Sequence, residues 1–330
     1  MHKKRVGVLR GGPSSEYEVS LKTGETVMKH IPQDKYDVQE IFISRDGTWH
    51  RAGVPIEPHD VFAHVDVIFN ALHGQYGEDG KVQHLLEKFH VPFTGSKTFA
   101  SALGMNKAFA KEVFKKAHIR TPQWHTIDRA LVKNPESFQE KIHELFRKFP
   151  LPVVVKPASA GSSVGVAIVK NFESFVPAIN EAFKHSDTVL IEEYIPGVEA
   201  TVGIIDGYRG VPFYALPSVE IRPHKEKGKG FFDYEAKYAG MSDEIVPSTF
   251  TFEQKEELEN LARRVHEALG LRHYSRTDFI VSPRRGIYVL EANTLPGLTE
   301  ASLVPKALGA IGAPLSHFLD HILELALEGK

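Results

Sequence analysis

Three oxygen-donor side chains near the carboxyl-terminal end of the chain are spaced so that they could hold a divalent metal together. Asp278 stands before one short hydrophobic run, and Glu291 and Asn293 follow a second run. Two carboxylates and an amide are hard donors that suit Mg²⁺ or Mn²⁺, and Mg²⁺ with few protein ligands usually shares its coordination with the phosphates of a substrate. A hairpin end with solvated acids is the alternative, and this segment alone leaves both interpretations open.

Two predicted strands position these donors. The runs Phe279 to Ser282 and Ile287 to Leu290 are joined by the sequence Pro-Arg-Arg-Gly, which predicts a turn between antiparallel strands. Folding the runs together places the residue before the first strand beside the residues after the second. Glu291 and Asn293 are two positions apart, so their side chains share one face of an extended segment.

A loop of small residues at Ala158 to Gly165 suits an anion. It lies between β-branched runs at Val153 to Lys156 and Val166 to Lys170. Backbone amides of small residues can approach a phosphate closely, and the ammonium of Lys156 would add positive charge. The loop is not a Walker A motif, because no Gly-Lys-Ser/Thr opens a helix. A flexible turn is the alternative for the loop alone, but the predicted strand Val189 to Tyr194 adds acids that could accept hydrogen bonds from adenine or ribose.

The amino-terminal part alternates strands and helices, which is typical of an open α/β sheet. The predicted strands are Arg5 to Leu9, Val38 to Ile43 and Val67 to Asn70, and the predicted helices are Lys81 to Phe89, Ser96 to Ala117, Phe252 to Leu269 and Leu315 to Leu327. Loops follow the first and third strands, at the edge where such sheets bind ligands. Gly11 and Gly12 lack a third glycine at the required spacing, so we reject a dinucleotide-binding fingerprint. The stretch Arg222 to Gly240 predicts a long functional loop.

The composition predicts a soluble globular protein of two or three domains. The chain has 330 residues, 42% hydrophobic and 25% charged, with a formal net charge of -2. We expect neither nucleic acid nor membrane as a partner, because the basic clusters are short and no apolar run approaches the ~18 residues that span a bilayer. The absence of cysteine excludes disulfides and thiolate chemistry and fits a reducing compartment, so we expect a cytoplasmic location.

Five separated motifs resemble those of the D-alanine–D-alanine ligases, a family of the ATP-grasp superfamily. They are GGPSSEYEVS at Gly11 to Ser20, ALHGQYGEDG at Ala71 to Gly80, VKPASAGSSVG at Val155 to Gly165, DYEAKY at Asp233 to Tyr238, and EANTLPGLT at Glu291 to Thr299. The last motif is shared widely among ATP-grasp enzymes, whereas the first, second and fourth are specific to the ligases. The resemblance runs through nearly the whole chain.

The resemblance implies a mixed α/β (α+β) architecture in which an ATP-grasp fold follows a Rossmann-like amino-terminal domain. We expect a substrate domain at residues 1–104, a central ATP-grasp subdomain at 105–200, and a carboxyl-terminal subdomain at 201–330 with the metal site and a lid loop at about 220–242. ATP would lie between the last two units. The resemblance also implies a homodimer formed through the amino-terminal domain.

The reaction implied by the resemblance is ATP-dependent ligation of two D-alanines through an acyl phosphate, for peptidoglycan precursor synthesis. A D-Ala-D-Lac or D-Ala-D-Ser ligase of the same fold is the alternative. Tyr238 favours D-alanine as the second substrate, because ligases of the family that accept D-lactate carry phenylalanine or a rebuilt loop here. A non-catalytic nucleotide sensor is a third hypothesis. It is disfavoured because every position that maps to a metal, nucleotide or substrate contact holds a residue able to make that contact.

By motif match, the resemblance assigns roles in nucleotide and metal binding. The nucleotide would be held by Lys107, Lys156, Ser163, Glu192 and Glu199, with the backbone near Glu193, Tyr194 and Ile195 at the adenine. Asp278, Glu291 and Asn293 would hold two Mg²⁺ (or Mn²⁺), and Glu291 would bridge them.

The resemblance assigns further roles in substrate binding and catalysis. A hydrogen-bonded trio near the first D-alanine maps to Glu18, Ser162 and Tyr238, in which Glu18 would receive the ammonium. His73 would lie near the same substrate. Arg276 and the amide of Gly297 would contact the developing tetrahedral centre, in an oxyanion-hole role. Lys237, Ser302 and the amide of Leu303 would bind the carboxylate of the second D-alanine.

Overall fold

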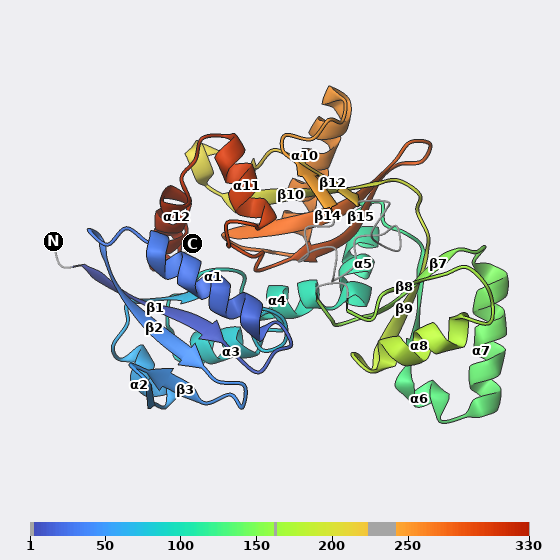
Figure 1. Cartoon of the computed structure of the whole chain (residues 1–330), viewed down its shortest axis with the longest axis horizontal. Coiled ribbons are helices and arrows are strands. Elements are labelled where there is room, and N and C mark those ends of the chain that lie inside the picture. The colour runs from blue at the N-terminus through green and yellow to red at the C-terminus, as the bar shows by residue number, and fades with distance from the viewer. Residues whose placement is uncertain (1–2, 162–163, 224–241, 330) are drawn as a thin grey trace.

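A five-stranded sheet forms the amino-terminal part of the protein, in a computed structural model that describes residues 3–161, 164–223 and 242–329. In spatial order its strands are β4 (Val54–Pro55), β3 (Trp49–Arg51), β2 (Tyr36–Ile43), β1 (Lys4–Gly11) and β5 (Val67–Asn70). The strand β1 is parallel to both β2 and β5, so the predicted strands and the open α/β sheet are confirmed. The arrows of β1 and β2 run in the same direction in Figure 1. Because β1 is also parallel to β5, the chain leaves β1 and β5 at the same edge of the sheet.

Helices cover both faces of this sheet. The helices are α1 (Tyr17–His30), α2 (Pro58–Phe62) and α3 (Lys81–Lys88). Val6 and Val8 of β1 are fully buried in one core cluster, together with residues of α1 and α12 (Leu315–Leu327). Leu9 is fully buried in a separate cluster with residues of α2 and α3. Burial on both faces explains why the sequence of β1 is a hydrophobic run and does not alternate between apolar and polar residues.

A four-stranded antiparallel sheet forms the middle part. Its order is β6 (Trp124–Asp128), β9 (Thr188–Glu193), β7 (Val153–Pro157) and β8 (Ala167–Val169). The helices α6 (Arg129–Val132), α7 (Pro135–Lys148) and α8 (Phe175–Phe183) belong to this part, and buried residues of α7 and α8 form its core with the sheet. The predicted strand, loop, strand arrangement around residues 153–170 is therefore confirmed, with β7 paired to β8.

A six-stranded antiparallel sheet forms the carboxyl-terminal part. The strands β13 (Ser242–Ile245), β12 (Val219–Pro223), β10 (Val198–Asp206), β14 (Tyr274–Ser282) and β15 (Gly286–Asn293) lie in that order, and β11 (Phe213–Ala215) pairs with β10. The helices around it are α10 (Phe252–Ala268), α11 (Leu303–Ala310) and α12, with a short 3₁₀ turn η1 (Tyr208–Gly210). The predicted helices in α10 and α12 are confirmed to within a residue.

The predicted single helix from Ser96 to Ala117 is wrong in one respect, because two helices occupy this range. They are α4 (Thr98–Met105) and α5 (Lys107–Lys116). Asn106 leaves the helical conformation with φ -91° and ψ 100°, and its side-chain oxygen accepts hydrogen bonds from the amides of Ala108 and Phe109 at 3.1 and 3.2 Å. This N-cap starts α5 in a new direction. Both helices contact β15, and Lys107 is the first residue of α5.

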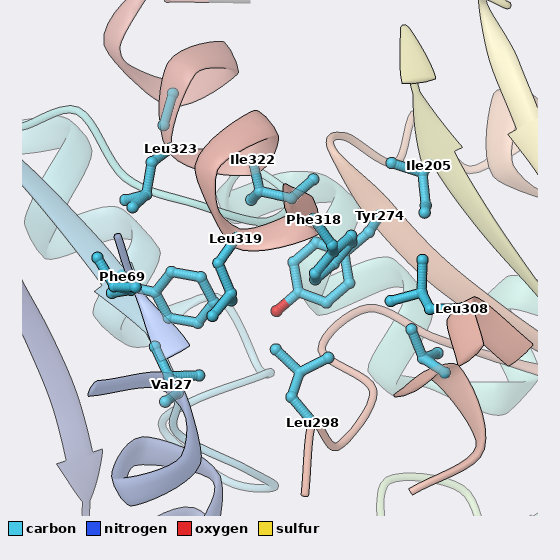
Figure 2. Close-up of a cluster of buried hydrophobic side chains, with 14 of the residues drawn as sticks. Val27, Phe69, Ile205, Tyr274, Leu298, Leu308, Phe318, Leu319, Ile322 and Leu323 are labelled. Carbon is cyan, nitrogen blue, oxygen red and sulfur yellow. The ribbon is translucent and has the colours of Figure 1, made fainter. Parts of the chain in front are cut away.

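The helix α12 joins the first and third sheets through a shared core. Phe318 packs edge-on against Tyr274 of β14, with ring centroids 5.4 Å apart, and Leu319 points toward Phe69 of β5 (Figure 2). This core fixes the ligand-binding edge of the first sheet relative to β14 and β15. The predicted unit boundaries at residues 104 and 200 stay a prediction. No helix among the described residues has the length and apolar character needed to cross a membrane.

Candidate active site

The hairpin of β14 and β15 brings the predicted metal donors together. Asp278 pairs with Glu291 across the two strands, and Arg276 pairs with Asn293 two residues further along. The register shifts between Asp278 and Phe279, immediately after the paired acids. A bulge of this kind changes the direction of the strand and is common beside active sites. The predicted proximity of the three oxygen donors is thus confirmed.

Asp278 is held rigidly from two sides. Arg276 donates two hydrogen bonds to its two carboxylate oxygens, at 2.8 and 2.9 Å, and the hydroxyl of Thr201 donates to Oδ1 at 2.7 Å. Burial acts to lower the pKa of Arg276, but the charges of Asp278 and Glu291 outweigh burial and raise it. Arg276 therefore stays a cation that faces the carboxylates at any ordinary pH.

Glu291 and Asn293 complete the donor set. Glu291 Oε2 lies 3.2 Å from Nζ of Lys107, and Asn293 Oδ1 accepts a hydrogen bond from the amide of Leu295 at 2.9 Å. Among the described residues no cluster of three or more His, Cys, Asp or Glu side chains forms a metal site. Two acids and an amide that line one cavity wall are nevertheless the donor types that Mg²⁺ takes, usually with phosphate oxygens in addition. The residues present therefore fit a magnesium ion that shares its ligands with a phosphate.

A cavity of about 440 Å³ lies between the second and third sheets. Its lining includes the predicted nucleotide and metal residues Lys107, Lys156, Glu192, Glu193, Tyr194, Ile195, Glu199, Asp278 and Glu291. The other lining residues are mainly aliphatic and come from both sheets. An apolar cleft with a few convergent charges is typical of a ligand site, and this one has room for a nucleotide.

A buried charge cluster stands at the wall of this nucleotide-sized cavity. Glu192 Oε2 lies 2.9 Å from Nζ of Lys156, and Glu192 Oε1 lies 3.0 Å from Nζ of Lys111 on α5. Burial raises the pKa of Glu192, but the two ammonium groups outweigh burial and hold it below its ordinary value. The sequence interpretation missed Lys111, which looks like any other lysine in an amphipathic helix.

The loop after β7 contacts α5 and the first sheet. The amide of Lys107 donates to the carbonyl of Ala158 at 2.9 Å, and its side chain donates to the carbonyl of Ala160 at 2.6 Å. A Cβ added to Gly161 would lie 2.6 Å from Oε2 of Glu16, so the backbone of this loop passes close to the Glu16 carboxylate. The predicted phosphate-loop residues Ser162 and Ser163 lie outside the described residues.

Glu193 connects the second and third sheets at the predicted adenine end of the cavity. Its carboxylate accepts hydrogen bonds from the amide of Gln123 and from Nη2 of Arg285, each at 3.1 Å. Its own amide donates to the carbonyl of Gln123 at 3.0 Å. Arg285 lies in the turn between β14 and β15, so this ion pair ties the hairpin to β9.

A second cavity, of about 720 Å³, lies between the loops of the first sheet and the third sheet. The predicted substrate and catalytic residues Glu18, His73, Arg276, Gly297, Ser302 and Leu303 line it, together with Asn293 and the unpredicted Glu16 and Glu78. The two cavities have a common wall, which consists of Lys107, Ala160, Glu199, Ile221, Asp278, Leu290 and Glu291. The predicted Lys237 and Tyr238 lie outside the described residues.

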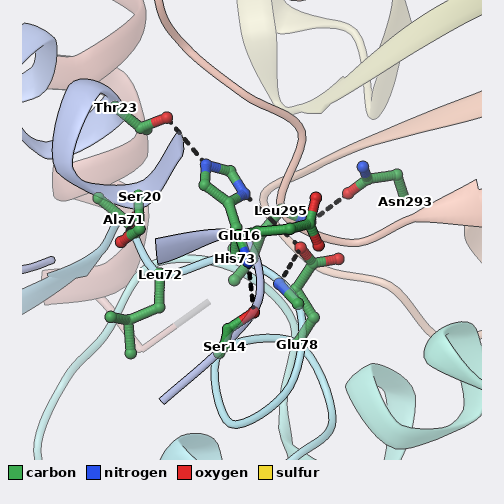
Figure 3. A network of polar contacts seen from close by, with 12 residues as sticks. Ser14, Glu16, Ser20, Thr23, Ala71, Leu72, His73, Glu78, Asn293 and Leu295 are labelled. Carbon is green, nitrogen blue, oxygen red and sulfur yellow. Dashed lines mark hydrogen bonds and ion pairs between the residues drawn. The ribbon is translucent and has the colours of Figure 1, made fainter. Parts of the chain in front are cut away.

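His73 is held in the wall of the second cavity by a buried network (Figure 3). Its Nε2 lies 2.8 Å from the hydroxyl of Thr23, and its Nδ1 lies 3.6 Å from Oε1 of Glu78. The same carboxylate oxygen accepts a hydrogen bond from the amide of Gly74 at 2.9 Å. These contacts orient the imidazole. Glu78 belongs to the same sequence motif as His73. Its position four residues after Gly74 did not by itself indicate that it would contact the histidine.

Two glutamates of the first motif have different surroundings. Glu18 is on α1 with its side chain 69% exposed, and it accepts a hydrogen bond from Arg45 at 2.9 Å. Glu16 is half-buried, and its Oε2 lies so close to two loops that a Cβ on Gly74 would be 2.7 Å away and one on Gly161 2.6 Å away. The carboxylate of Glu16 therefore lies where the loop at Gly74 and the loop after β7 approach each other. Figure 3 shows Glu16 beside His73 and Glu78.

The start of α11 forms the far end of the second cavity. Ser302 precedes α11, and its Oγ lies 2.8 Å from the hydroxyl of Thr299. A Cβ added to Gly297 would lie 2.9 Å from Ser302 Oγ, so the backbone of Gly297 passes directly beside this hydroxyl. The structure thus brings the predicted residues Gly297, Ser302 and Leu303 together.

The fold and the site together define the class of protein to which this chain belongs. Two antiparallel sheets that enclose a nucleotide-sized cavity, with lysines on one side and paired acids on the other, form the ATP-grasp fold, here preceded by an open α/β domain. Comparisons with known proteins give the family. The family model "D-ala D-ala ligase C-terminus" matches residues 113–324, and "D-ala D-ala ligase N-terminus" matches residues 5–58 and 51–96. The chain belongs to the D-alanine–D-alanine ligase family.

Relatives match the chain over nearly its full length. It is 40% identical to a D-alanine–D-alanine ligase of Geotalea uraniireducens, with 98% of this chain and 96% of the relative covered. It is 39% identical to one of Geobacter sulfurreducens, with 99% and 96% covered. Among solved structures, the VanG D-Ala:D-Ser ligase of Enterococcus faecalis superposes with a TM-score of 0.83 at 29% identity, over 98% of this chain and 100% of that one. The fold also matches a Coxiella burnetii D-alanine–D-alanine ligase, with a TM-score of 0.82 at 24% identity over 100% of this chain and 95% of that one.

Proposed function

We propose that this protein uses ATP to join two D-alanines into D-alanyl-D-alanine. The observation that carries the proposal is the common wall of the two cavities, which places Asp278 and Glu291 against both. A phosphoryl group that leaves a nucleotide in the first cavity would reach a substrate carboxylate in the second at this wall. The acceptor carboxylate gains the γ-phosphoryl group and ADP leaves. The amine of the second D-alanine then forms the C–N bond, loses a proton, and displaces inorganic phosphate.

The nucleotide would occupy the first cavity, with its phosphates toward the common wall. Lys156 and Lys107 face that cavity and supply positive charge, while Glu192 and Glu199 accept from the base and ribose. The backbone at Tyr194 and Ile195 would contact the adenine, together with Glu193. Ser162 and Ser163 belong to this proposal through the family motif. Catalysis of phosphoryl transfer depends mainly on such positioning and on neutralising charge.

Two magnesium ions would be held by Asp278, Glu291 and Asn293. When bound, they would neutralise charge on the phosphates and polarise the transferred group. Arg276 already directs its guanidinium at Asp278 and lines the second cavity, so it would stabilise negative charge on the reacting carboxylate. The amide of Gly297, which lines the same cavity, would assist as one donor of an oxyanion hole.

The first D-alanine would bind between the first-sheet loops and the phosphate loop. The sequence placed its ammonium on Glu18, but the geometry favours Glu16, because Glu18 is an exposed partner of Arg45 and Glu16 lies between Gly74 and Gly161. His73, oriented by its buried contacts, would lie near the same amino acid. Ser162 and Tyr238 would complete the trio that the family motif implies.

The second D-alanine would bind near the start of α11. Its carboxylate would accept from Ser302 and from the amide of Leu303, and Lys237 would supply a positive charge. The open amides of a helix N-terminus, together with a hydroxyl at the preceding position, form an anion site. The amine of this D-alanine would then face the common wall, where the acyl phosphate forms.

The reaction is tested by phosphate release from ATP with D-alanine as the only amino acid. We expect continuous turnover that requires Mg²⁺ and yields D-alanyl-D-alanine. D-serine and D-lactate, each added with limiting D-alanine, test the second site, because a similar fold belongs to a D-Ala:D-Ser ligase. No turnover with D-alanine alone, together with turnover in the presence of D-serine, would assign the chain to the mixed ligases instead.

We also propose a cytoplasmic homodimer that supplies peptidoglycan precursor synthesis. The support is membership of the ligase family, whose product enters that pathway. Sedimentation of the purified protein tests the dimer. Depletion of the protein in its host, followed by loss of D-alanyl-D-alanine-containing precursors, tests the pathway.

A further inference from the structure

A lysine outside the nucleotide-sized cavity is paired with a carboxylate that lines it. Nζ of Lys111 is fully buried on α5, 3.0 Å from Glu192 Oε1, and it donates to the hydroxyl of Thr121 at 2.5 Å. Its ammonium also lies over the ring of Trp124, 5.6 Å from the centroid. Glu192 and Lys156 both line the cavity, whereas Lys111 is not one of the described residues that line it.

The cluster contains one carboxylate between two ammonium groups. Lys156 and Lys111 each hold a different oxygen of Glu192, so the three side chains carry a net charge of plus one. With Lys111 removed, the carboxylate would be balanced by Lys156 alone, and the cluster would be neutral. Because the cluster is almost fully buried, this difference in charge is only weakly screened by water.

We propose that Lys111 is a positioning residue for nucleotide binding, which balances the negative charge at one oxygen of Glu192 so that the charge of Lys156 is available to the phosphates. The inference rests on the proposed function, because it assumes that a nucleotide occupies the cavity. Lys111 acts through Glu192 and does not touch the ligand. Its ion pair with Oε1 also favours the observed orientation of the Glu192 carboxylate, with that oxygen toward α5.

A purely structural role predicts something different. A buried ion pair between α5 and β9 would affect folding, and its removal would lower thermal stability without a specific change in ligand affinity. A positioning role predicts weaker nucleotide binding in a protein that is still folded. The two roles therefore separate when affinity and stability are measured on the same variants.

The experiment is calorimetric titration of the purified full chain with ADP and Mg²⁺. For Lys111→Met, which keeps the chain length and removes the charge, we expect the dissociation constant for ADP to rise by on the order of tenfold. The KM for ATP should rise in proportion, and kcat should change little. Lys111→Arg, which keeps the charge, should recover most of the affinity. Lys115→Met, an exposed neutralisation on the same helix, should bind ADP like the unchanged protein.

A double-mutant cycle tests whether Lys111 acts through Glu192. In a Glu192→Gln background, the change Lys111→Met should have an effect on ADP affinity of less than about twofold, because no carboxylate remains to be balanced. Equal effects in both backgrounds would overturn the inference. So would unchanged affinity of Lys111→Met with a lowered unfolding temperature. If the unchanged protein fails to bind ADP, the proposed function itself is wrong, which is a distinguishable result.

Discussion

Replacing Glu16 by glutamine, in parallel with the same change at Glu18, decides which carboxylate receives the ammonium of the first D-alanine. The side chains of Glu18 and Arg45 are 69% and 61% exposed. Exposed ion pairs contribute at most about 1 kcal/mol, so Glu18→Gln should change kcat/KM for D-alanine by less than about fivefold. Glu16 is half-buried where Gly74 and Gly161 approach, and water screens its charge less. Loss of a charged partner in such a place costs about 3 kcal/mol, which corresponds to roughly 150-fold in kcat/KM.

The assay is coupled phosphate release at varied D-alanine and saturating ATP. Glu16→Gln should raise the KM for the first D-alanine or lower kcat, while the dissociation constant for ADP stays unchanged, because Glu16 lines only the second cavity. Circular dichroism of both variants controls for folding. A large loss of activity in Glu18→Gln with near-normal activity in Glu16→Gln would refute the reasoning and restore the assignment made from the sequence.

Three further predictions concern the metal site, pH and stability. Glu291→Gln should lower kcat by at least about 100-fold and weaken the dependence of the rate on Mg²⁺, measured by metal titration, because it removes an acid from the common wall. Burial lowers the pKa of Lys111 to about 8, and the charges that face it are Glu192, Lys156 and Glu291. As pH rises through 8, Lys111 loses its proton, so the ADP affinity of the unchanged protein should fall severalfold while that of Lys111→Met stays flat in calorimetry. Thr251→Ala, which removes the capping box of α10, should lower the free energy of unfolding by about 1 kcal/mol in urea titrations and leave the KM for ATP unchanged.

The sequence was sufficient to predict that the metal donors meet, because a turn between two antiparallel strands brings the residue before the first strand beside the residues after the second. The exact partner did not follow from the turn, because an uninterrupted register would pair Asp278 with Leu290, and the shift between Asp278 and Phe279 makes Glu291 the partner instead. The break at Asn106 also had a signal, since asparagine before a charged residue is a strong helix start. The continuous apolar pattern from α4 into α5 hid it, because both helices bury a face against β15.

Lys111 and Glu16 required the tertiary structure. Helical periodicity marks a lysine as exposed, and only the approach of β9 to α5 makes Lys111 fully buried beside Glu192. In the first motif, two glutamates lie two positions apart, one just before α1 and one within it. The directions of the two glutamate side chains depend on where α1 begins. A sequence motif gives the first residue of a helix only to within a residue or two.

The common wall explains why the residues of one reaction are dispersed through the chain. Lys107 reaches it from α5, Ala160 from the loop after β7, and Glu291 from β15, so these three elements must be docked before the wall exists. Lys107 joins two of them directly, since its side chain contacts both the carbonyl of Ala160 and the carboxylate of Glu291. A phosphoryl group transferred at this wall would pass between groups that all three elements supply. No single sheet of the protein could place these groups around a reactive acyl phosphate, which has to be kept from water.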